Sequence, residues 1–188
     1  KVFKGNLKKQ GYISEVKSVL SEFAQYGVDF ERLDDFMKEV PPESYLHYKL
    51  DDIRTIYEKF EEYLSEKYIT KEEMLDVLSD AVPYSDILKG SVVAMDGFTG
   101  FTPVQNRLIG ELFSVCEKVM ITVTMDGREN PYVYEHPYQI FALGKQMVTS
   151  LMKIAGEKKT EIEEPICLFE RPVYRFRDCS EMAFLETE

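Results

Sequence analysis

The sequence has few of the features that mark metal-binding, membrane or secreted proteins. Its three cysteines, Cys116, Cys167 and Cys179, show no paired short spacing, so no zinc or iron–sulfur motif can be read from them. No apolar run approaches the roughly 20 residues of a bilayer-spanning helix, and the chain does not start with a signal-peptide pattern. We therefore expect a soluble protein of the reducing cytoplasm with no membrane partner.

Positive charge is also scarce. The chain has 34 acidic residues against 23 lysines and arginines, which gives a formal net charge of −11 at pH 7. Because phosphate binding normally depends on clustered lysine and arginine, this balance disfavours DNA binding by the chain alone, apart from a lysine group within residues 1–9. Hydrophobic residues make up 44% of the chain, enough for the core of one substantial domain or two small ones.

Two parts of an ATPase site are missing. A phosphate-binding loop of the form GxxxxGKS/T does not occur in the 188 residues, so this chain alone cannot be a working ATPase. In nucleotide hydrolases of the helicase type, an aspartate at the end of a strand is followed by a glutamate that activates water. In this sequence the residue after Asp96 is Gly97. His47 and His136 lie far apart in the sequence and merit no catalytic role.

The first ninety residues predict helices only. Apolar residues recur at helical spacing over residues 13–23, 33–40, 46–64 and 74–78. Gly27 and Pro41 should end the first two helices, and Thr70 with Glu73 has the form of a capping box that starts the fourth. The narrow 46–64 seam could form a coiled coil, but it lasts under three heptads, which favours packing against its helical neighbours. We expect Met74, Leu75 and Leu78 to be buried.

From residue 91 onward the pattern becomes mixed. Residues 92–95 predict a strand buried on both faces of a parallel sheet, and residues 119–124 predict a second strand. Between them, Thr102, Pro103 and Gln105 supply the N-cap, first-turn proline and capping-box partner of a helix on which we expect Cys116 to be buried. This order predicts a βαβ unit. A helix over 140–152, a third strand over 160–168 and a last helix capped by Ser180 should follow.

Asp96 is the candidate for chemistry. It falls at the carboxyl end of the first predicted strand, where open α/β sheets place ligand-binding groups, and its carboxylate could hold magnesium beside a nucleotide. The alternative is an aspartate that makes a turn with the glycine after it. Two other groups are weaker candidates. The aromatic residues Tyr132, Tyr134, Tyr138 and Phe141 could stack on nucleic-acid bases or could pack in the core or a loop. The arginines Arg171, Arg175 and Arg177 could contact phosphate.

The string MDGFTGFTPVQ, at residues 95–105, closely resembles the AddB subunits of bacterial AddAB (RexAB) helicase–nucleases. Residues 57–78 are similar to the helical stretch ahead of this motif in those proteins, and residues 175–186 are similar to a later helicase-like region. Against superfamily 1 helicases, the resemblance aligns Asp96 with the nucleotide- and magnesium-binding aspartate, Gly97 with the catalytic glutamate and Gly100 with a second acid. It aligns Pro103 and Gln105 with the first residues of the helix that follows the loop in those helicases.

The resemblance implies an α/β fold with an incomplete P-loop, superfamily 1 helicase-like parallel sheet and an inserted all-helical subdomain. Residues 1–88 would be the helical subdomain, similar to helicase subdomain 1B, and residues 89–188 a partial α/β helicase-like domain. Asp96 would be a nucleotide-binding remnant, with Gly97, Gly100, Thr102, Pro103 and Gln105 structural. No catalytic residue and no metal ligand set would lie in this chain, which we interpret as an internal fragment of a longer protein.

The function implied is a non-hydrolysing scaffold segment of an ATP-dependent DNA helicase/exonuclease subunit that acts in double-strand-break repair by homologous recombination. The parent complex would be a heterodimer with an AddA-type subunit and would contact DNA as a whole. Magnesium, ATP and a 4Fe-4S cluster would bind outside this segment. Two other interpretations stay open: an α/β hydrolytic enzyme with a site near Asp96, and a helical interaction module with exposed apolar surface along residues 46–64.

Overall fold

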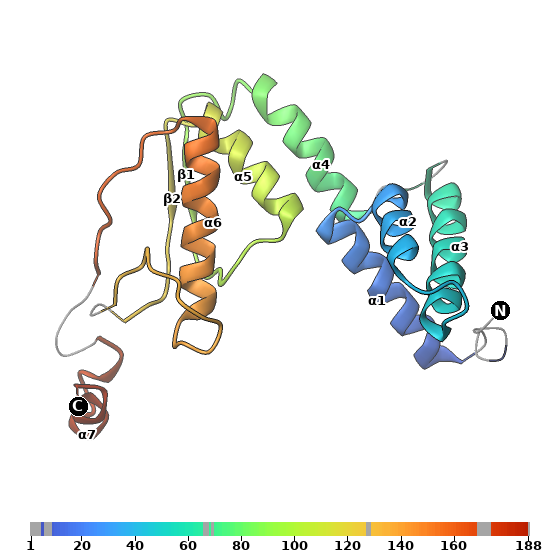
Figure 1. The fold of residues 1–188 in the computed structure, drawn as a ribbon. Coiled ribbons are helices and arrows are strands. Elements are labelled where there is room, and N and C mark those ends of the chain that lie inside the picture. Colours follow the sequence, from blue (N-terminus) through green and yellow to red (C-terminus); the bar gives the residue numbers. More distant parts are fainter. Residues whose placement is uncertain are drawn as a thin grey trace. The chain divides into compact units, whose positions relative to one another are not determined.

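A computed structural model of the chain describes residues 5, 9–65, 68, 70–126, 129–168 and 174–187. The order of elements is helices first and then a strand–helix–strand unit, as the sequence predicts (Figure 1). The chain divides into two compact units, residues 1–122 and 123–188. The division into subdomains near residue 88, which rests on the helicase resemblance, stays a prediction. Within the described residues, no helix is long and apolar enough to cross a bilayer.

The first three helices begin and end where their local sequence dictates. Helix α1 (Gln10–Tyr26) ends at Gly27, which adopts a left-handed conformation with φ of 62°. Helix α2 (Phe30–Glu39) is capped by Asp29, whose carboxylate accepts a hydrogen bond from the Arg32 amide at 2.8 Å, and it ends just before Pro41. Helix α3 (Tyr45–Ser65) is the longest of the three. All three predicted helices are confirmed.

These helices share one hydrophobic core. Its buried members are Leu20 of α1, Leu33 of α2, Val40 after α2, and Leu50 and Tyr57 of α3. The Tyr57 hydroxyl donates to the Val28 carbonyl at 3.2 Å, which satisfies the polar end of a buried ring. The seam of α3 therefore packs against neighbouring helices, as predicted, although Leu46 and Phe60 at its edges are exposed.

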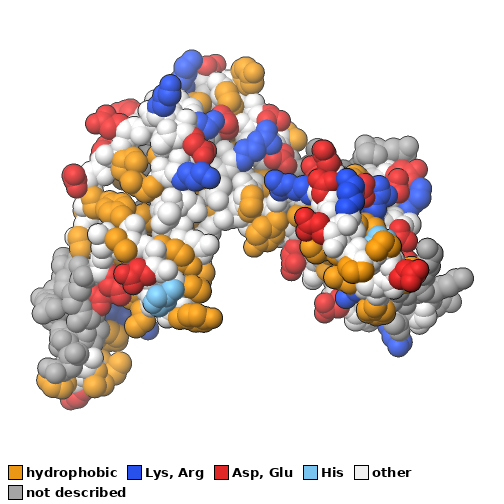
Figure 2. Space-filling view, viewed as in Figure 1, with side chains coloured by type: hydrophobic (Ala, Val, Ile, Leu, Met, Phe, Trp, Pro, Cys, Tyr) orange, Lys and Arg blue, Asp and Glu red, His pale blue; other side chains and the backbone are white. Residues whose placement is uncertain are grey.

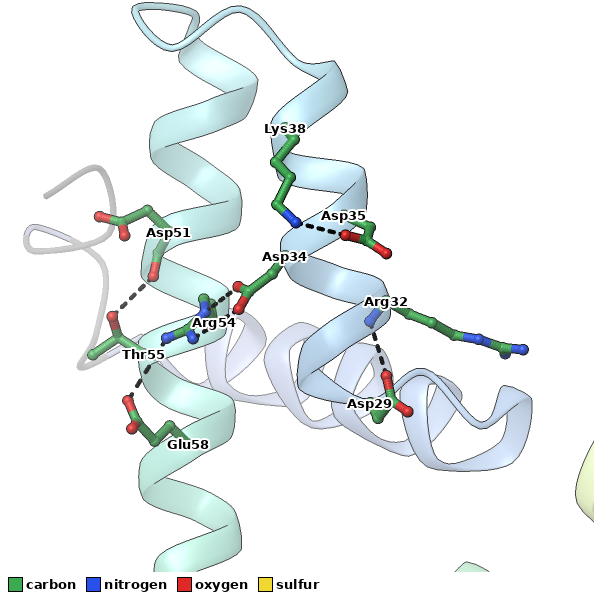
Figure 3. Close-up of polar contacts among 9 residues, drawn as sticks. All are labelled: Asp29, Arg32, Asp34, Asp35, Lys38, Asp51, Arg54, Thr55 and Glu58. Carbon is green, nitrogen blue, oxygen red and sulfur yellow. Dashed lines mark hydrogen bonds and ion pairs between the residues drawn. The ribbon is translucent and has the colours of Figure 1, made fainter.

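A polar contact also joins α2 to α3. The Arg54 guanidinium donates from Nε to one carboxylate oxygen of Asp34 at 2.5 Å and from Nη2 to the other at 3.1 Å (Figure 3). Arg54 also lies 4.0 Å from Glu58 on its own helix. Because the Asp34 contact is bidentate, it fixes the register of the two helices as well as adding attraction.

Helix α4 (Lys71–Ala81) starts at the predicted capping box. Thr70 accepts from the Glu73 amide at 3.1 Å, and the Glu73 carboxylate accepts from the Thr70 amide at 2.7 Å. A short 3-10 helix, η1 (Val82–Tyr84), follows at Pro83. The expected burial of Met74 and Leu78 is wrong, because α4 packs on helix α5 through a different face and leaves these side chains exposed.

The βαβ unit is confirmed. Strand β1 (Val92–Met95) and strand β2 (Lys118–Ile121) pair in parallel, with Val92 opposite Lys118, and helix α5 (Pro103–Val115) connects them. A mixed helical chain with a small parallel sheet is consistent with the α/β class. Strand β2 is shorter than the predicted 119–124. The prediction that β1 is buried on both faces is wrong: burial alternates along it, because the described sheet has only two strands.

The second unit contains helix α6 (Ala142–Lys158), the 3-10 helix η2 (Tyr174–Phe176) and helix α7 (Ser180–Thr187). Helix α6 begins after Ile140 and Phe141, which were expected inside it. The predicted strand at 160–168 is wrong: these residues form no strand, and Ile162, Ile166 and Leu168 are exposed. A strand needs a neighbouring strand for its backbone hydrogen bonds, and among the described residues none pairs with this segment. Helix α7 is confirmed, but Ser180 is its first residue rather than a cap.

Candidate functional site

Asp96 lies where the sequence places it, at the carboxyl edge of a parallel strand pair. Strand β1 ends at Met95, whose carbonyl accepts from the Thr122 amide at 3.0 Å, one residue beyond the end of β2. This contact extends the register by one step and brings Asp96 beside Thr122. The Thr122 hydroxyl donates a hydrogen bond to Asp96 Oδ1. The edge therefore presents an exposed carboxylate held in place by a hydroxyl from the neighbouring strand.

Gly97 has a conformation that other residues rarely adopt. Its φ is +81°, and a Cβ built on it would meet nothing within 4 Å. The constraint is thus on the backbone and not on space: the chain turns sharply right after Asp96, and an L side chain there would strain the turn. A glutamate at this position, which the helicase alignment would require for water activation, would strain the observed turn by about 1 to 2 kcal/mol.

The next glycine of the loop is under no such backbone constraint. Gly100 has no positive φ, and a Cβ on it would meet nothing within 4 Å, so the structure gives no conformational reason for a glycine there. Phe98 and Phe101 flank it with their ring centroids 5.0 Å apart. Phe98 is exposed and Phe101 half-buried.

The remaining motif residues build the start of α5. Thr102 Oγ1 accepts from the Gln105 amide at 3.4 Å, and Gln105 Oε1 accepts from the Thr102 amide at 2.9 Å, with Pro103 in the first turn. Their polar atoms are therefore engaged in a capping box, which is what the sequence predicts for this helix start. Their visible role is structural, and their alignment with helicase motif positions stays a prediction.

The described residues do not form a metal centre. No group of three or more His, Cys, Asp or Glu side chains in the described ranges could hold a metal ion. Asp96 alone offers one carboxylate, with one oxygen already accepting from Thr122, so these residues do not fit a complete magnesium site. Cys167 and Cys179 are exposed, and no disulfide joins the three cysteines.

Cys116 is half-buried and not buried as predicted. It is the C-cap residue of α5, and its amide donates to the Leu112 carbonyl at 2.9 Å, so it lies beyond the apolar face of the helix. Its sulfur is 3.6 Å from the Ser91 hydroxyl oxygen.

The weaker candidates stay dispersed. Tyr132, Tyr134 and Tyr138 are exposed, and Phe141 is half-buried, so the three tyrosines are not core residues. Arg171 lies outside the described residues. Arg175 lies over the ring of Phe176 at 5.6 Å, and Arg177 approaches Asp178 at 4.0 Å. Both are contacts with the next residue along the chain, and a phosphate contact stays a prediction.

Sequence reasoning missed two contacts. Thr122 could have been found, because parallel pairing of the two strands in register places the residue after Ile121 beside the residue after Met95. Arg107 of α5 reaches back to α4, with Nη1 2.6 Å from Asp76 Oδ1 and Nη2 2.5 Å from Asp80 Oδ1. No sequence motif signals this second contact, since it depends on how two helices pack.

The protein is thus a mixed helical chain with a small parallel sheet. An aspartate and a glycine in the left-handed conformation follow the first strand of this sheet. Over residues 1–186 the chain matches the sequence profile of the family described as ADDB, N-terminal. The chain therefore belongs to that family.

Curated relatives agree with this assignment. The B subunit of the ATP-dependent helicase/deoxyribonuclease of Lachnoclostridium phytofermentans is 38% identical over 189 residues, which covers 98% of this chain. The B subunits of the enzymes of the same name from Thermoanaerobacter sp. and Clostridium acetobutylicum are 35% and 33% identical and cover 99% of the chain. The chain spans 16% of the length of each of these relatives.

Proposed function

We propose that this chain is a helicase-like, non-hydrolysing scaffold segment of the B subunit of a helicase/deoxyribonuclease. Its role would be to hold the architecture of a complex that processes DNA double-strand breaks for homologous recombination. The α/β elements would correspond to part of a superfamily 1 helicase-like sheet, and the helices ahead of them to a 1B-like subdomain. The proposal rests on the family membership and on the named function of the relatives.

The observation that carries the non-hydrolysing part is the turn at Gly97. Asp96 keeps the strand-end position of a nucleotide-site acid, while the next residue has a φ of +81° and no side chain. A general base that activates water must reach the attacked phosphate with a carboxylate or an equivalent group, and Gly97 has none. No GxxxxGKS/T loop occurs in the chain to hold the phosphates.

The cofactors and partners of the whole complex would be bound elsewhere. Magnesium, ATP and a 4Fe-4S cluster would belong to parts of the complex outside this segment, and DNA would be contacted by the complex as a whole. The partner would be an AddA-type subunit. The relatives are themselves named as subunits, which supports a complex of this kind.

Phosphate release from ATP tests the proposal. The purified chain, shown to be folded by its helical circular dichroism, should release no phosphate above the buffer background in the presence of magnesium and single-stranded DNA. The matched control is Asp96→Ala, which should give the same background. Magnesium-dependent turnover that the Asp96→Ala substitution abolishes would show that Asp96 belongs to a working site and would refute the scaffold role.

A further inference from the structure

Helix α4 has an apolar face that the described residues leave exposed. Met74, Val77, Leu78 and Ala81 recur at steps of three and four and so lie on one side of the helix. Met74 and Val77 are each 59% exposed. Beyond the end of α4, Tyr84 and Ile87 are also exposed, at 86% and 88%. Met74, Val77, Leu78 and Ala81 are called the α4 face below.

The folding of α4 does not explain this face. The helix already packs on α5 and η1, where Ser79 and Val82 are buried, and it makes a smaller contact with α1. The Ser79 hydroxyl donates to the Leu75 carbonyl at 2.7 Å, so its burial leaves no unpaired hydroxyl. Single exposed hydrophobic residues are normal, and Figure 2 shows them at many places on the visible surface. The α4 face differs in its regular helical spacing, which is typical of a helix face that packs against a partner.

Negative charge adjoins one edge of the α4 face, where Asp80 follows Val77 by three residues, while Asp76 lies further round toward α5. Asp76 and Asp80 share the single guanidinium of Arg107, so this trio keeps a net negative charge. Both carboxylates stay accessible to solvent, as their side chains are 46% and 71% exposed. Over residues 71–89 the sequence has five acids and two lysines. A partner with flanking positive charge would be attracted to this edge.

The same charge argues against a second copy of this chain as the occupant. Two copies would each carry −11 and would bring the acidic edges of α4 near each other. A partner helix with flanking lysine or arginine can instead supply the missing positive charge.

We propose that the α4 face is a docking site for an amphipathic helix of another polypeptide, one whose apolar residues are flanked by lysine or arginine. The partner's apolar side chains pack on Met74, Val77 and Leu78. Its cations lie along the edge next to Asp80. This proposal does not depend on the DNA-processing role, since it rests on the packing and charge of α4 alone.

A fluorescent peptide of about 18 residues tests the docking site, because shorter helices are marginal in water. It carries leucine on one helical face and lysine on the other, and its binding to the full 188-residue chain is followed by fluorescence anisotropy. Two further peptides serve as probes of specificity: one with glutamate in place of lysine, and one with the same composition in scrambled order. The lysine peptide should bind saturably and at least about tenfold more tightly than either of them.

Variants of the chain locate the binding. Met74→Gln with Val77→Gln keeps good helix formers on exposed positions and should weaken binding about tenfold or more, because two apolar contacts are lost. Asp80→Asn should weaken binding about two- to fivefold and reduce its salt dependence, while Asp76 retains Arg107. Ile13→Gln with Phe36→Gln, at exposed positions on α1 and α2, is the matched control and should leave binding unchanged.

Three results would overturn the proposal. Equal binding of the lysine and scrambled peptides would show nonspecific charge attraction. Equal losses in the α4 variant and in the α1/α2 control would place binding elsewhere. Concentration-dependent dimerisation of the chain that Met74→Gln with Val77→Gln abolishes would assign the α4 face to a second copy.

Discussion

The α1–α3 bundle and the βαβ unit differ in how completely they bury their apolar residues. The bundle encloses Leu20, Leu33 and Leu50 between three helices of its own. Within the described residues the sheet has two strands, and Val92 on β1 remains 55% exposed although the sequence of β1 is typical of a buried strand. Parallel sheets normally have both faces covered, and two strands alone are marginally stable. The bundle thus has a hydrophobic core enclosed by its own helices, whereas the sheet depends on the helix packed beside it.

The largest effect should come from the core of the bundle. Leu33 of α2 is 3% exposed, so Leu33→Ala should lower the free energy of unfolding by roughly 2 to 5 kcal/mol through lost burial and the cavity left behind. Urea denaturation followed by helical circular dichroism measures the loss.

Phe36→Ala is the matched control, on the same helix at 50% exposure, and should cost less than about 1 kcal/mol. Equal costs at the two positions would mean that the bundle is not closed. The contrast with the sheet would then disappear.

A smaller effect should distinguish the two glycines of the loop after β1. Gly97→Ala forces a Cβ onto a backbone with φ of +81° and should destabilise this region by about 1 to 2 kcal/mol. Gly100→Ala meets no such constraint and should be neutral or slightly stabilising, because alanine restricts the unfolded chain.

Hydrogen exchange of the Thr122 amide, which bonds to the Met95 carbonyl, gives a local readout for both glycine variants. Exchange should accelerate in Gly97→Ala and stay unchanged in Gly100→Ala. Similar exchange in the two variants would show that the turn tolerates side chains equally at both positions. The argument against a glutamate at Gly97 would then fail.

Local signals explain why so much of the fold could be predicted. Gly27, Thr70 and Thr102 each act on the backbone within a few residues, so the ends of α1, α4 and α5 follow from sequence alone. The parallel pairing of β1 with β2 follows from a strand–helix–strand order of the right length. The position of Asp96 at the carboxyl edge is a consequence of that pairing.

Predictions about burial failed where they depended on nonlocal neighbours. Met74 and Leu78 have the spacing of buried residues, but which face of α4 is covered depends on where α5 lies. Ile162 and Ile166 have β-type character, but a strand exists only when another strand supplies its hydrogen bonds. The role of Asp96 is not fixed by sequence for the same reason, since one carboxylate acquires a function only from the groups that surround it.

The smallest effect should come from the ion pair that joins α2 to α3, and it should depend on pH. The hydrogen bond from Arg54 holds the pKa of Asp34 below its ordinary value of 3.8. Because the folded-state pKa is the lower one, the contact stabilises the bundle fully above about pH 4 and is lost as the pH falls through the folded-state value. Asp34→Asn should therefore be less stable than the natural chain at neutral pH, and this difference should shrink in acid.

Arg54→Gln removes the other partner of the same contact and should lose the same acid-dependent part of the stability. Urea denaturation of both variants and of the double variant, at neutral and acidic pH, measures this component. The double variant should be no more acid-dependent than either single one, because both changes break one interaction. If the stability of Asp34→Asn fell in acid as steeply as that of the natural chain, another carboxylate would control the acid response. The α2–α3 contact would then set the register of the bundle without contributing to its pH dependence.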